Sequence, residues 1–325
     1  MAKRNLVEAI NSGLMVEMER DSRVVVLGED VGKEGGVFRV TDGLQVKFGL
    51  NRVFDTPLAE SGIIGVSIGM AVNGLRPVAE IQFEGFLHLA MNQIMNHAAR
   101  IRTRSRGRFT CPLVIRSPWG GGIHAPEHHS DSPEALFAHT PGMKVVIPST
   151  PYDAKGLLIS AIRDPDPVLF FEPKRIYRAI REEVPDGEYT VPLGKAKLVR
   201  EGKDVTVITW GAMLREVLKA AETADKDGVK VEVIDLRTIS PMDDVTFLES
   251  VRKTGRAVVV HEAPPTCGVG AEVIARINEK ALLSLQGPVA RVTAFDTIVP
   301  LTKLENLYLP SPERILRGIR KAMTF

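Results

Sequence analysis

Short runs of β-branched residues alternate with helical patterns along the whole chain. In the first half the predicted strands are 24–27, 78–81, 113–115, 145–147 and 168–171, and the predicted helices are 59–72, 86–104 and 151–162. In the second half the predicted strands are 205–209, 231–234, 257–260 and 289–295, and the predicted helices are 214–224, 243–253, 269–283 and one from residue 312. Such alternation is typical of an α/β fold, with parallel sheets between layers of helices.

The N-terminal segment predicts a further, amphipathic helix. Its apolar face is formed by Leu6, Ala9, Ile10, Leu14, Met15 and Met18. A connection rich in Pro, Gly and Glu separates the two alternating halves. We therefore expect a first domain at 1–185, a linker at 186–203 and a second domain at 204–325. The chain has 325 residues, 44% of them hydrophobic and 25% charged, which is enough for two full hydrophobic cores.

Charge and cysteine content narrow the class of protein. The formal net charge of +2 gives no overall attraction to nucleic acid or membrane, and no apolar stretch reaches membrane-spanning length. The two cysteines, Cys111 and Cys267, show no metal-ligand spacing, and no apolar signal segment precedes the first helix. We therefore expect a cytoplasmic protein with no nucleic-acid partner.

One local run of arginines departs from this balance. Every second residue from Arg100 to Arg108 is an arginine. A phosphate-binding or nucleic-acid patch is one interpretation. A solvated helix end or a subunit contact is favoured, because no aromatic residues are interleaved with the arginines.

Glu60 is the most informative single residue, because it is an isolated carboxylate at the start of an otherwise apolar, small-residue helix. Thr56 and Pro57 are predicted as its cap and first residue. Burial raises the pKa of such a group and a helix N-terminus lowers it, so the sequence leaves the net shift open. Proton exchange with a heterocycle nitrogen is one interpretation. A first-turn glutamate that points into water is the alternative, and it is the commoner case for an arbitrary sequence.

Ligands of parallel sheets bind at the carboxyl ends of strands. The loops expected there are 28–32, 82–86 and 116–131, and the last is rich in glycine and carries His124, His128 and His129. A transition-metal site that includes Glu127 is disfavoured, because Pro126 breaks the segment and adjacent histidines cannot share a helix face. A proton-transferring histidine is a stronger interpretation, and ordinary loop histidines remain possible.

A second glycine-rich segment, 267–272, lacks the third glycine of a dinucleotide fingerprint. A tight start of a helix explains it better. The chain has no Walker lysine loop and no Gly-x-Ser-x-Gly elbow, so phosphotransfer and serine hydrolysis lose support.

A series of longer blocks occurs in one order along nearly the whole chain. They are Val-Leu-Gly-Glu-Asp-Val (26–31), Gly-Gly-Val-Phe-Arg-Val-Thr (35–41), Arg-Val-Phe-Asp-Thr-Pro-Leu-Ala-Glu (52–60), Ala-Glu-Ile-Gln-Phe (79–83), Ile-Arg-Ser-Pro-Trp-Gly (115–120), His-Ser-Asp-Ser-Pro-Glu-Ala (129–135), Phe-Phe-Glu-Pro-Lys (170–174), Asp-Leu-Arg-Thr-Ile-Ser-Pro (235–241) and His-Glu-Ala-Pro (261–264). Together they resemble the beta subunits of the thiamine-dependent, decarboxylating component of 2-oxo acid dehydrogenase complexes, of the pyruvate and branched-chain type. The resemblance implies two three-layer domains, a transketolase-like pyrimidine-binding domain and a transketolase C-terminal-like domain.

The resemblance also implies thiamine diphosphate as cofactor and assigns roles to residues. Glu60 matches the glutamate that hydrogen-bonds the aminopyrimidine ring and promotes loss of the thiazolium proton. His129 matches the active-site histidine that assists acyl transfer, whereas the neighbouring His128 does not align with that histidine. Further implied positions are Leu58 and Gln82 lining the cofactor, Phe86 stacking on its ring where relatives often carry Tyr, Glu29 near a channel that joins paired active sites, and a K⁺ site at Leu113, Ala161, Asp164 and Asp166. Relatives often have Asn at position 166.

A missing motif predicts the partner. Thiamine enzymes hold the diphosphate through Mg²⁺ on a Gly-Asp-Gly motif, which this chain lacks. The resemblance therefore implies an alpha subunit that holds Mg²⁺, in an alpha2-beta2 heterotetramer, and a lipoyl acyltransferase core that receives the acyl group from a 2-oxo acid. An acetoin dehydrogenase beta subunit, a transketolase-like half-chain and a cofactor-free assembly protein are the alternatives.

Overall fold

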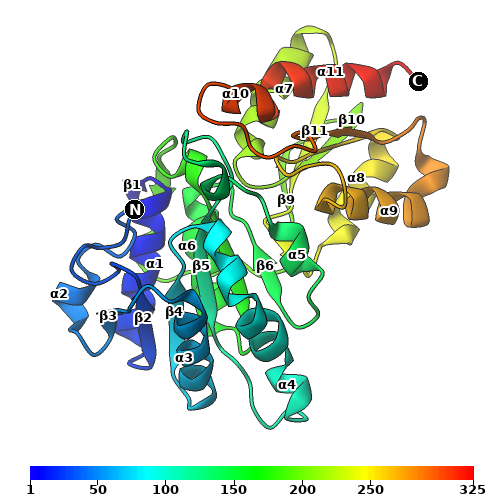
Figure 1. Cartoon of the computed structure of the whole chain (residues 1–325). Helices are drawn as coiled ribbons and strands as arrows, with labels where there is room; N and C mark the ends of the chain where they lie inside the picture. The colour runs from blue at the N-terminus through cyan, green and yellow to red at the C-terminus, as the bar shows by residue number, and fades with distance from the viewer. The chain divides into compact units, whose positions relative to one another are not determined.

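The computed structural model describes residues 1–325 and divides into two compact units (Figure 1). Unit 1 comprises Met1–Trp119 and Leu136–Leu193, and unit 2 comprises Gly120–Ala135 and Gly194–Phe325. The chain thus leaves unit 1 at Gly120 and returns at Leu136, within the short helix α5 (Glu134–Ala138). The pattern of apolar residues does not indicate that residues 120–135 belong to unit 2. The predicted domain limits remain a prediction.

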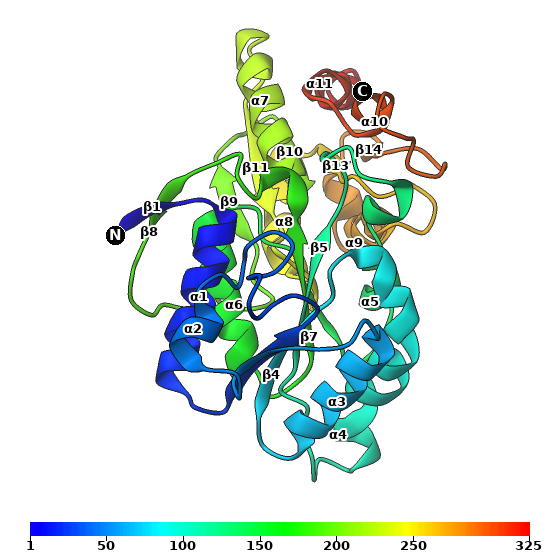
Figure 2. The ribbon, with the colours of Figure 1, turned by 60° about the vertical axis from the view of Figure 1, so that its left-hand side comes forward.

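Unit 1 contains six parallel strands in the order β6-β7-β5-β4-β2-β3. Their bounds are β2 Val24–Gly28, β3 Val53–Asp55, β4 Arg76–Glu80, β5 Val114–Trp119, β6 Lys144–Val146 and β7 Val168–Pro173. Every strand predicted for the first half is present, and β3 is additional. Helices α1 (Leu6–Arg20) and α6 (Pro151–Arg163) pack on each other and cover one face, while α3 (Glu60–Val72) lies on the other (Figure 2). Unit 1 is therefore the predicted three-layer arrangement.

The edges of unit 1 hold short elements that the apolar pattern does not predict. They are the antiparallel pair β1 (Ala2–Arg4) and β8 (Glu182–Val184), and the helix α2 (Leu44–Phe48). The predicted N-terminal helix is present as α1. Asn5 caps it by accepting a hydrogen bond from the backbone N–H of Glu8, whose side chain accepts one from the Asn5 N–H in return. Its predicted apolar face is buried, except for the half-buried Met15.

The prediction of one α-helix over 86–104 is wrong. The segment is a 3₁₀ turn at Glu84–Ala90 (η1), a π turn at Asn92–His97 (η2), a second 3₁₀ turn at Ala98–Arg100 (η3) and a short helix α4 at Ile101–Arg104. Its buried positions Leu87, Ala90, Ile94 and Ala98 still recur every three or four residues. Apolar spacing therefore predicted the helical path, but it does not determine the size of each hydrogen-bonded ring.

Unit 2 contains a five-stranded sheet in the order β14-β13-β10-β11-β9. The parallel strands are β10 Val205–Thr209, β11 Val231–Asp235, β13 Ala257–Val260 and β14 Ala290–Val292, and the antiparallel edge strand is β9 Lys197–Arg200. The strand β12 (Thr238–Ser240) follows β11. Strand β9 falls within the predicted linker, where charged and polar residues hide the strand pattern of an edge.

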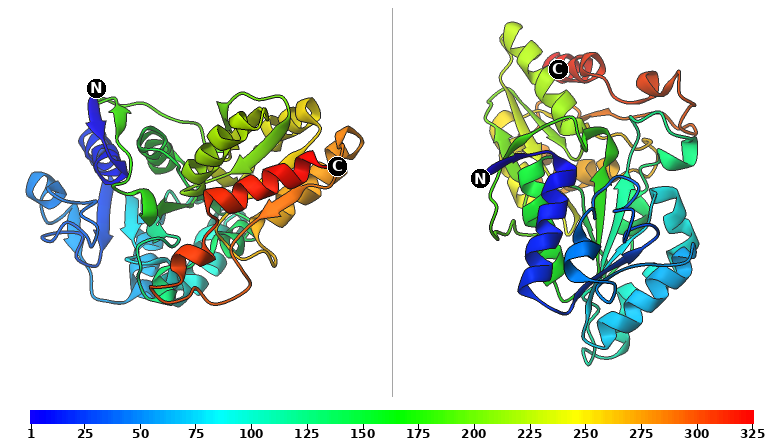
Figure 3. Two further views of the ribbon diagram at one scale, coloured as in Figure 1. Left: turned by 90° about the horizontal axis from the view of Figure 1, so that it is seen from above. Right: turned by 90° about the vertical axis from the view of Figure 1, so that its left-hand side faces the viewer.

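Two pairs of helices pack against the sheet of unit 2. Helix α7 (Met213–Lys226) runs beside α11 (Pro312–Met323), and α8 (Asp244–Thr254) contacts α9 (Val269–Ala281) (Figure 3). The turn η6 (Leu282–Ser284) follows α9, and the one-turn helix α10 (Glu305–Tyr308) precedes α11. No helix of the chain is both long and apolar enough to cross a membrane.

Candidate active site

Glu60 is the first residue of α3 and is only 4% exposed. Its carboxylate has no hydrogen-bond or ion-pair partner within the chain. The alternative of a first-turn glutamate in water is therefore wrong. A buried carboxyl without a partner is costly unless another group meets it, so this position is a candidate ligand contact.

The predicted cap of this helix is also wrong, because Ala59 is the N-cap and α3 begins three residues after Pro57. The Thr56 N–H donates to the Gly28 carbonyl oxygen at 2.9 Å, so the chain stays extended beside β2. The Thr56 hydroxyl oxygen is buried without a partner. Thr56 therefore extends the strand instead of capping the helix.

Glu29 lies near Glu60 at the carboxyl end of β2. It is 7% exposed, and its Oε1 is buried without a partner. Burial raises the pKa of Glu29, and the negative charges of Glu60 and Asp30 raise it further. Gln82, just beyond β4, donates to Asp30 Oδ2 at 3.0 Å and to the Glu29 carbonyl oxygen at 3.4 Å. The structure thus brings Glu29, Gln82 and Glu60 together within unit 1.

The two predicted apolar contacts lie on the segments that flank this group. Phe86 is the third residue of η1 and is half-buried, and its ring meets Phe83 edge to face at 6.2 Å. Leu58 is 78% exposed, two residues before Glu60. The site thus combines the exposed Leu58, the half-buried ring of Phe86 and buried oxygens without a hydrogen-bond partner. Such a set can bind an aromatic heterocycle that carries a hydrogen-bonding nitrogen. A cavity of about 500 Å³ lies elsewhere, against α1, and none of these residues lines it.

Charged residues missed by the sequence interpretation are buried on the central strands β4, β5 and β7. Arg116 on β5 donates to Glu80 on β4 at 2.7 Å and to Glu172 on β7 at 2.6 and 3.0 Å. The Tyr177 hydroxyl donates to Glu172 at 2.7 Å. Burial opposes the charge of Arg116, but Glu172 and Glu80 outweigh it and raise the pKa of Arg116. The available signal was a charged residue within or directly after each of three predicted apolar strands.

His129 lies in the part of the histidine loop that belongs to unit 2. It ends a short turn, Glu127–His129, closed by a hydrogen bond from its N–H to the Pro126 carbonyl oxygen at 2.9 Å. Its ring is 4.1 Å from that of His128, which is exposed. No group of three or more His, Cys, Asp or Glu side chains in the chain is arranged to hold a metal ion.

Glu305 anchors the start of this loop. It is 1% exposed, and its carboxylate accepts hydrogen bonds from the backbone N–H of Gly122 at 2.7 Å and of His124 at 2.9 Å. His124 adopts a positive φ of 58° and its Nδ1 lies 2.9 Å from the Thr302 carbonyl oxygen. The His124 Nδ1 also lies 3.1 Å from Glu305 Oε2, so His124 is a structural member of the loop. Glu305 was not predicted because it is far from the loop in sequence.

Replacing Glu305 with alanine is expected to loosen the histidine loop, because two backbone donors lose their acceptor at about 1–3 kcal/mol each. Hydrogen exchange followed by mass spectrometry should show roughly tenfold faster exchange in peptides that cover 120–131. Glu313→Ala, an exposed acid in the first turn of α11, is the control. Unchanged protection in the Glu305 variant would refute the anchoring role.

The four positions predicted for K⁺ lie in unit 1, between the end of α6 and the start of β5 and β7. The Asp164 carboxylate accepts from Lys144 Nζ at 2.6 Å, and that of Asp166 accepts from Arg102 Nε at 2.6 Å. The Leu113 carbonyl oxygen accepts from the Val168 N–H, and the Ala161 carbonyl oxygen from the Asp164 N–H. These protein partners already supply positive charge there, and the K⁺ site stays a prediction.

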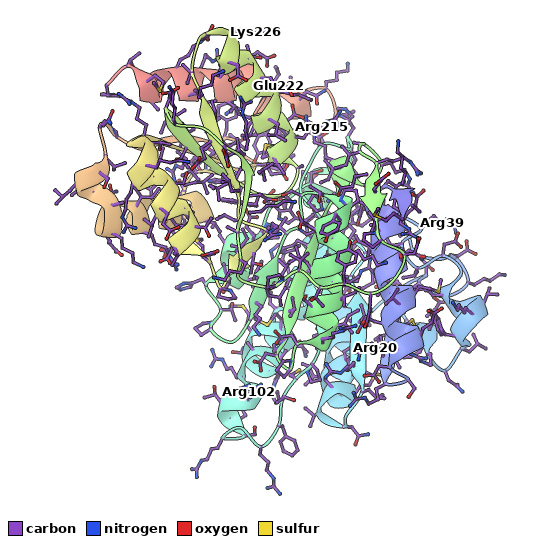
Figure 4. All side chains as sticks on the ribbon, turned by 180° about the vertical axis from the view of Figure 1, so that it is seen from behind. Arg20, Arg39, Arg102, Arg215, Glu222 and Lys226 are labelled. Atoms are coloured by element: carbon purple, nitrogen blue, oxygen red, sulfur yellow. The ribbon has the colours of Figure 1, made fainter.

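The arginine run is the end of an irregular helix. Arg100 and Arg104 donate to the carbonyl oxygens of Met95 and Asn96, and Arg102, visible on α4 in Figure 4, pairs with Asp166. Such carbonyls at a helix end need donors. These contacts favour the interpretation as a solvated helix end over a phosphate-binding patch.

The glycines at 268 and 270 form a tight start of α9. A side chain on Gly270 would lie 2.5 Å from Nε2 of the buried His261, whose ring stacks on Trp210 at 5.2 Å. Burial lowers the pKa of His261 to about 3, so this ring is neutral. The glycines therefore leave room for the buried His261 ring, and the interpretation as a nucleotide-binding turn loses support.

Both cysteines, Cys111 and Cys267, are free thiols.

Comparison with known proteins identifies the class. Residues 2–180 match the family described as the transketolase pyrimidine binding domain, and residues 194–315 match the transketolase C-terminal domain. A solved chain described as a split-gene transketolase, an inactive beta4 tetramer, superposes with a TM-score of 0.82 at 24% identity over 99% of both chains, which shows the shared fold. The predicted fold class is confirmed.

Full-length relatives narrow this to one family. The chain is 55% identical over 325 residues, all of both chains, to the pyruvate dehydrogenase E1 component subunit beta of Bacillus subtilis. It is 56% identical to that of Acholeplasma laidlawii over 99% of this chain and 98% of the relative, and 54% identical to that of Staphylococcus aureus strain Mu50 over both full lengths. The chain belongs to the family of E1 beta subunits of 2-oxo acid dehydrogenase complexes. The resemblance inferred from the sequence is confirmed.

Proposed function

We propose that this chain, with an alpha subunit, catalyses thiamine-diphosphate-dependent oxidative decarboxylation of pyruvate and passes the acetyl group to lipoamide. The observation that carries the proposal is the buried, unpartnered Glu60 carboxylate at the carboxyl ends of the strands of unit 1. Such a group suits proton sharing with a ring nitrogen.

Each predicted site residue has a role in this proposal. The cofactor supplies the electron sink for loss of carbon dioxide. Glu60 shares a proton with the pyrimidine ring, Phe86 stacks on it, and Leu58 and Gln82 line it. His129 donates a proton to the reacting group and assists acyl transfer, and Glu29 provides a second titratable carboxyl beside Glu60.

Completion of the site is assigned to the alpha subunit. The chain has no Gly-Asp-Gly motif, and no three of its His, Cys, Asp or Glu side chains are grouped to hold a metal ion. Large apolar side chains are also exposed, at Leu58 and Leu89 in unit 1 and at Ile298, Leu301, Leu304 and Leu307 in unit 2, and contact with a partner would bury them. We therefore propose an alpha2-beta2 heterotetramer that docks a lipoyl acyltransferase core through unit 2. K⁺ binding and a cytoplasmic location remain parts of the proposal.

The named relatives favour pyruvate over branched 2-oxo acids and acetoin. The test is turnover of the reconstituted alpha-beta pair with each substrate and a lipoyl-domain acceptor. We expect kcat/KM for pyruvate to exceed the others by about tenfold or more, the discrimination that a few methylene groups allow. Preference for another substrate, or turnover by this chain alone, would contradict the proposal.

A further inference from the structure

A completely buried ion pair joins the start of the segment that carries Phe86 to the end of β7. Lys174 Nζ donates to both carboxylate oxygens of Glu84 at 2.6 Å, and both side chains have no exposed surface. Glu84 is the first residue of η1, and Phe86 is two residues further on. Lys174 follows the last residue of β7 and begins the turn η5 (Lys174–Ile176).

The segment that carries Phe86 has weak support of its own. A 3₁₀ turn has poorer hydrogen-bond geometry than an α-helix, and the N-cap of η1, Phe83, makes no side-chain capping bond. The turn is closed by the Phe86 N–H, which donates to the Phe83 carbonyl oxygen at 3.0 Å. Its position relative to the sheet therefore depends on tertiary contacts.

The lysine also supports the ring next to Phe86. Lys174 Nζ lies 5.7 Å from the centre of the Phe83 ring, a cation–π distance. Phe83 meets Phe86 edge to face and contacts Phe38 on another side at 5.6 Å. One ammonium group thus holds both the first residue of the turn and the ring against which Phe86 packs.

From these contacts we infer that the Glu84–Lys174 pair is a positioning element that fixes Phe86 for cofactor binding. Strand β7 pairs on both sides, with β5 and β6, so it is a rigid reference for the lysine. A buried ion pair adds little net stability over apolar residues of the same size, whereas it fixes geometry. The inference rests on the proposed role of Phe86 at thiamine diphosphate.

The test separates positioning from stability. Thiamine diphosphate affinity of the reconstituted alpha-beta pair is measured by calorimetry, and the unfolding midpoint by thermal scanning. Lys174→Met should weaken cofactor binding by about tenfold or more, since a small misplacement of a site group is costly. It should also lower the midpoint, because the buried Glu84 loses the counter-charge of Lys174.

Two further variants make the result decisive. The double variant Glu84→Gln with Lys174→Met removes both charges of this buried pair, so the midpoint should recover while the cofactor stays weakly bound. The control is Lys155→Met, which removes another fully buried lysine. Lys155 donates to Ser12 and to the carbonyl oxygens of Pro185 and Asp186. This variant should lower the midpoint and leave the cofactor affinity within twofold of the wild type. Unchanged affinity in Lys174→Met, or an equal loss in Lys155→Met, would overturn the inference. A wild-type pair that binds no cofactor would overturn the proposed function as well.

Discussion

Replacing Glu60 with glutamine is expected to lower kcat of the reconstituted alpha-beta pair by about 10²- to 10⁴-fold, the usual contribution of a positioned proton-transfer group. Glutamine keeps the size of the side chain and removes the exchangeable proton. Since Glu60 has no partner within the chain, the substitution orphans no other group. Assembly and the unfolding midpoint should therefore change little, and steady-state kinetics at saturating cofactor would measure the effect.

The matched control is Glu313→Gln, the same chemical change at an exposed acid in the first turn of α11. Its kcat should equal that of the wild type. If Glu60→Gln kept kcat within twofold of the wild type, the carboxyl would have no part in proton transfer. A loss of assembly in that variant would instead make Glu60 a structural residue.

Replacing Arg116 with methionine is expected to have the largest effect on stability. The substitution leaves Glu80 and Glu172, 5% and 0% exposed, without their shared counter-charge. Breaking a buried charge network in this way costs about 3–5 kcal/mol. Denaturant unfolding of the alpha-beta complex should show this loss as a lower midpoint for unit 1. The control is Arg102→Met, which removes the exposed ion pair with Asp166 and should change the midpoint little.

The same variant should show a characteristic pH dependence. Burial raises the pKa of Glu80, and Arg116 opposes this, so the pKa of Glu80 should rise further when Arg116 is removed. A carboxyl with a higher pKa in the folded than in the unfolded chain favours folding as pH falls below the folded value. Part of the lost stability should therefore return as the pH is lowered from neutrality toward 4.5, the ordinary pKa of a glutamate. Stability that falls further with acid would contradict this account.

The central strands and long helices could be predicted from the sequence because they bury continuous apolar faces. The edge elements could not. Strand β9 carries polar and charged residues, β1 and β8 pair over only three residues each, and the excursion of 120–135 into unit 2 depends on long-range contacts. The π turn at Asn92–His97 keeps the apolar spacing of an α-helix, so the sequence pattern cannot distinguish the two.

Motifs in the sequence predicted which site residues to consider, but their surroundings required coordinates. The burial of Glu60 depends on α3 beginning at that residue. Thr56 has the residue type of a cap, but its bond to Gly28 places it in an extended segment. Arg116 and Lys174 are far in sequence from their acidic partners. Local pattern cannot identify such pairs, since sheet order decides which strand ends meet.

The most direct test of the account is a calorimetric titration of thiamine diphosphate with Mg²⁺ into this chain alone, into the alpha subunit alone and into the mixture. The account predicts saturable binding only in the mixture, with one cofactor per alpha-beta pair. Tight binding to this chain by itself would show that it holds a whole cofactor site, and would contradict the claim that Glu60 completes a site shared between two chains.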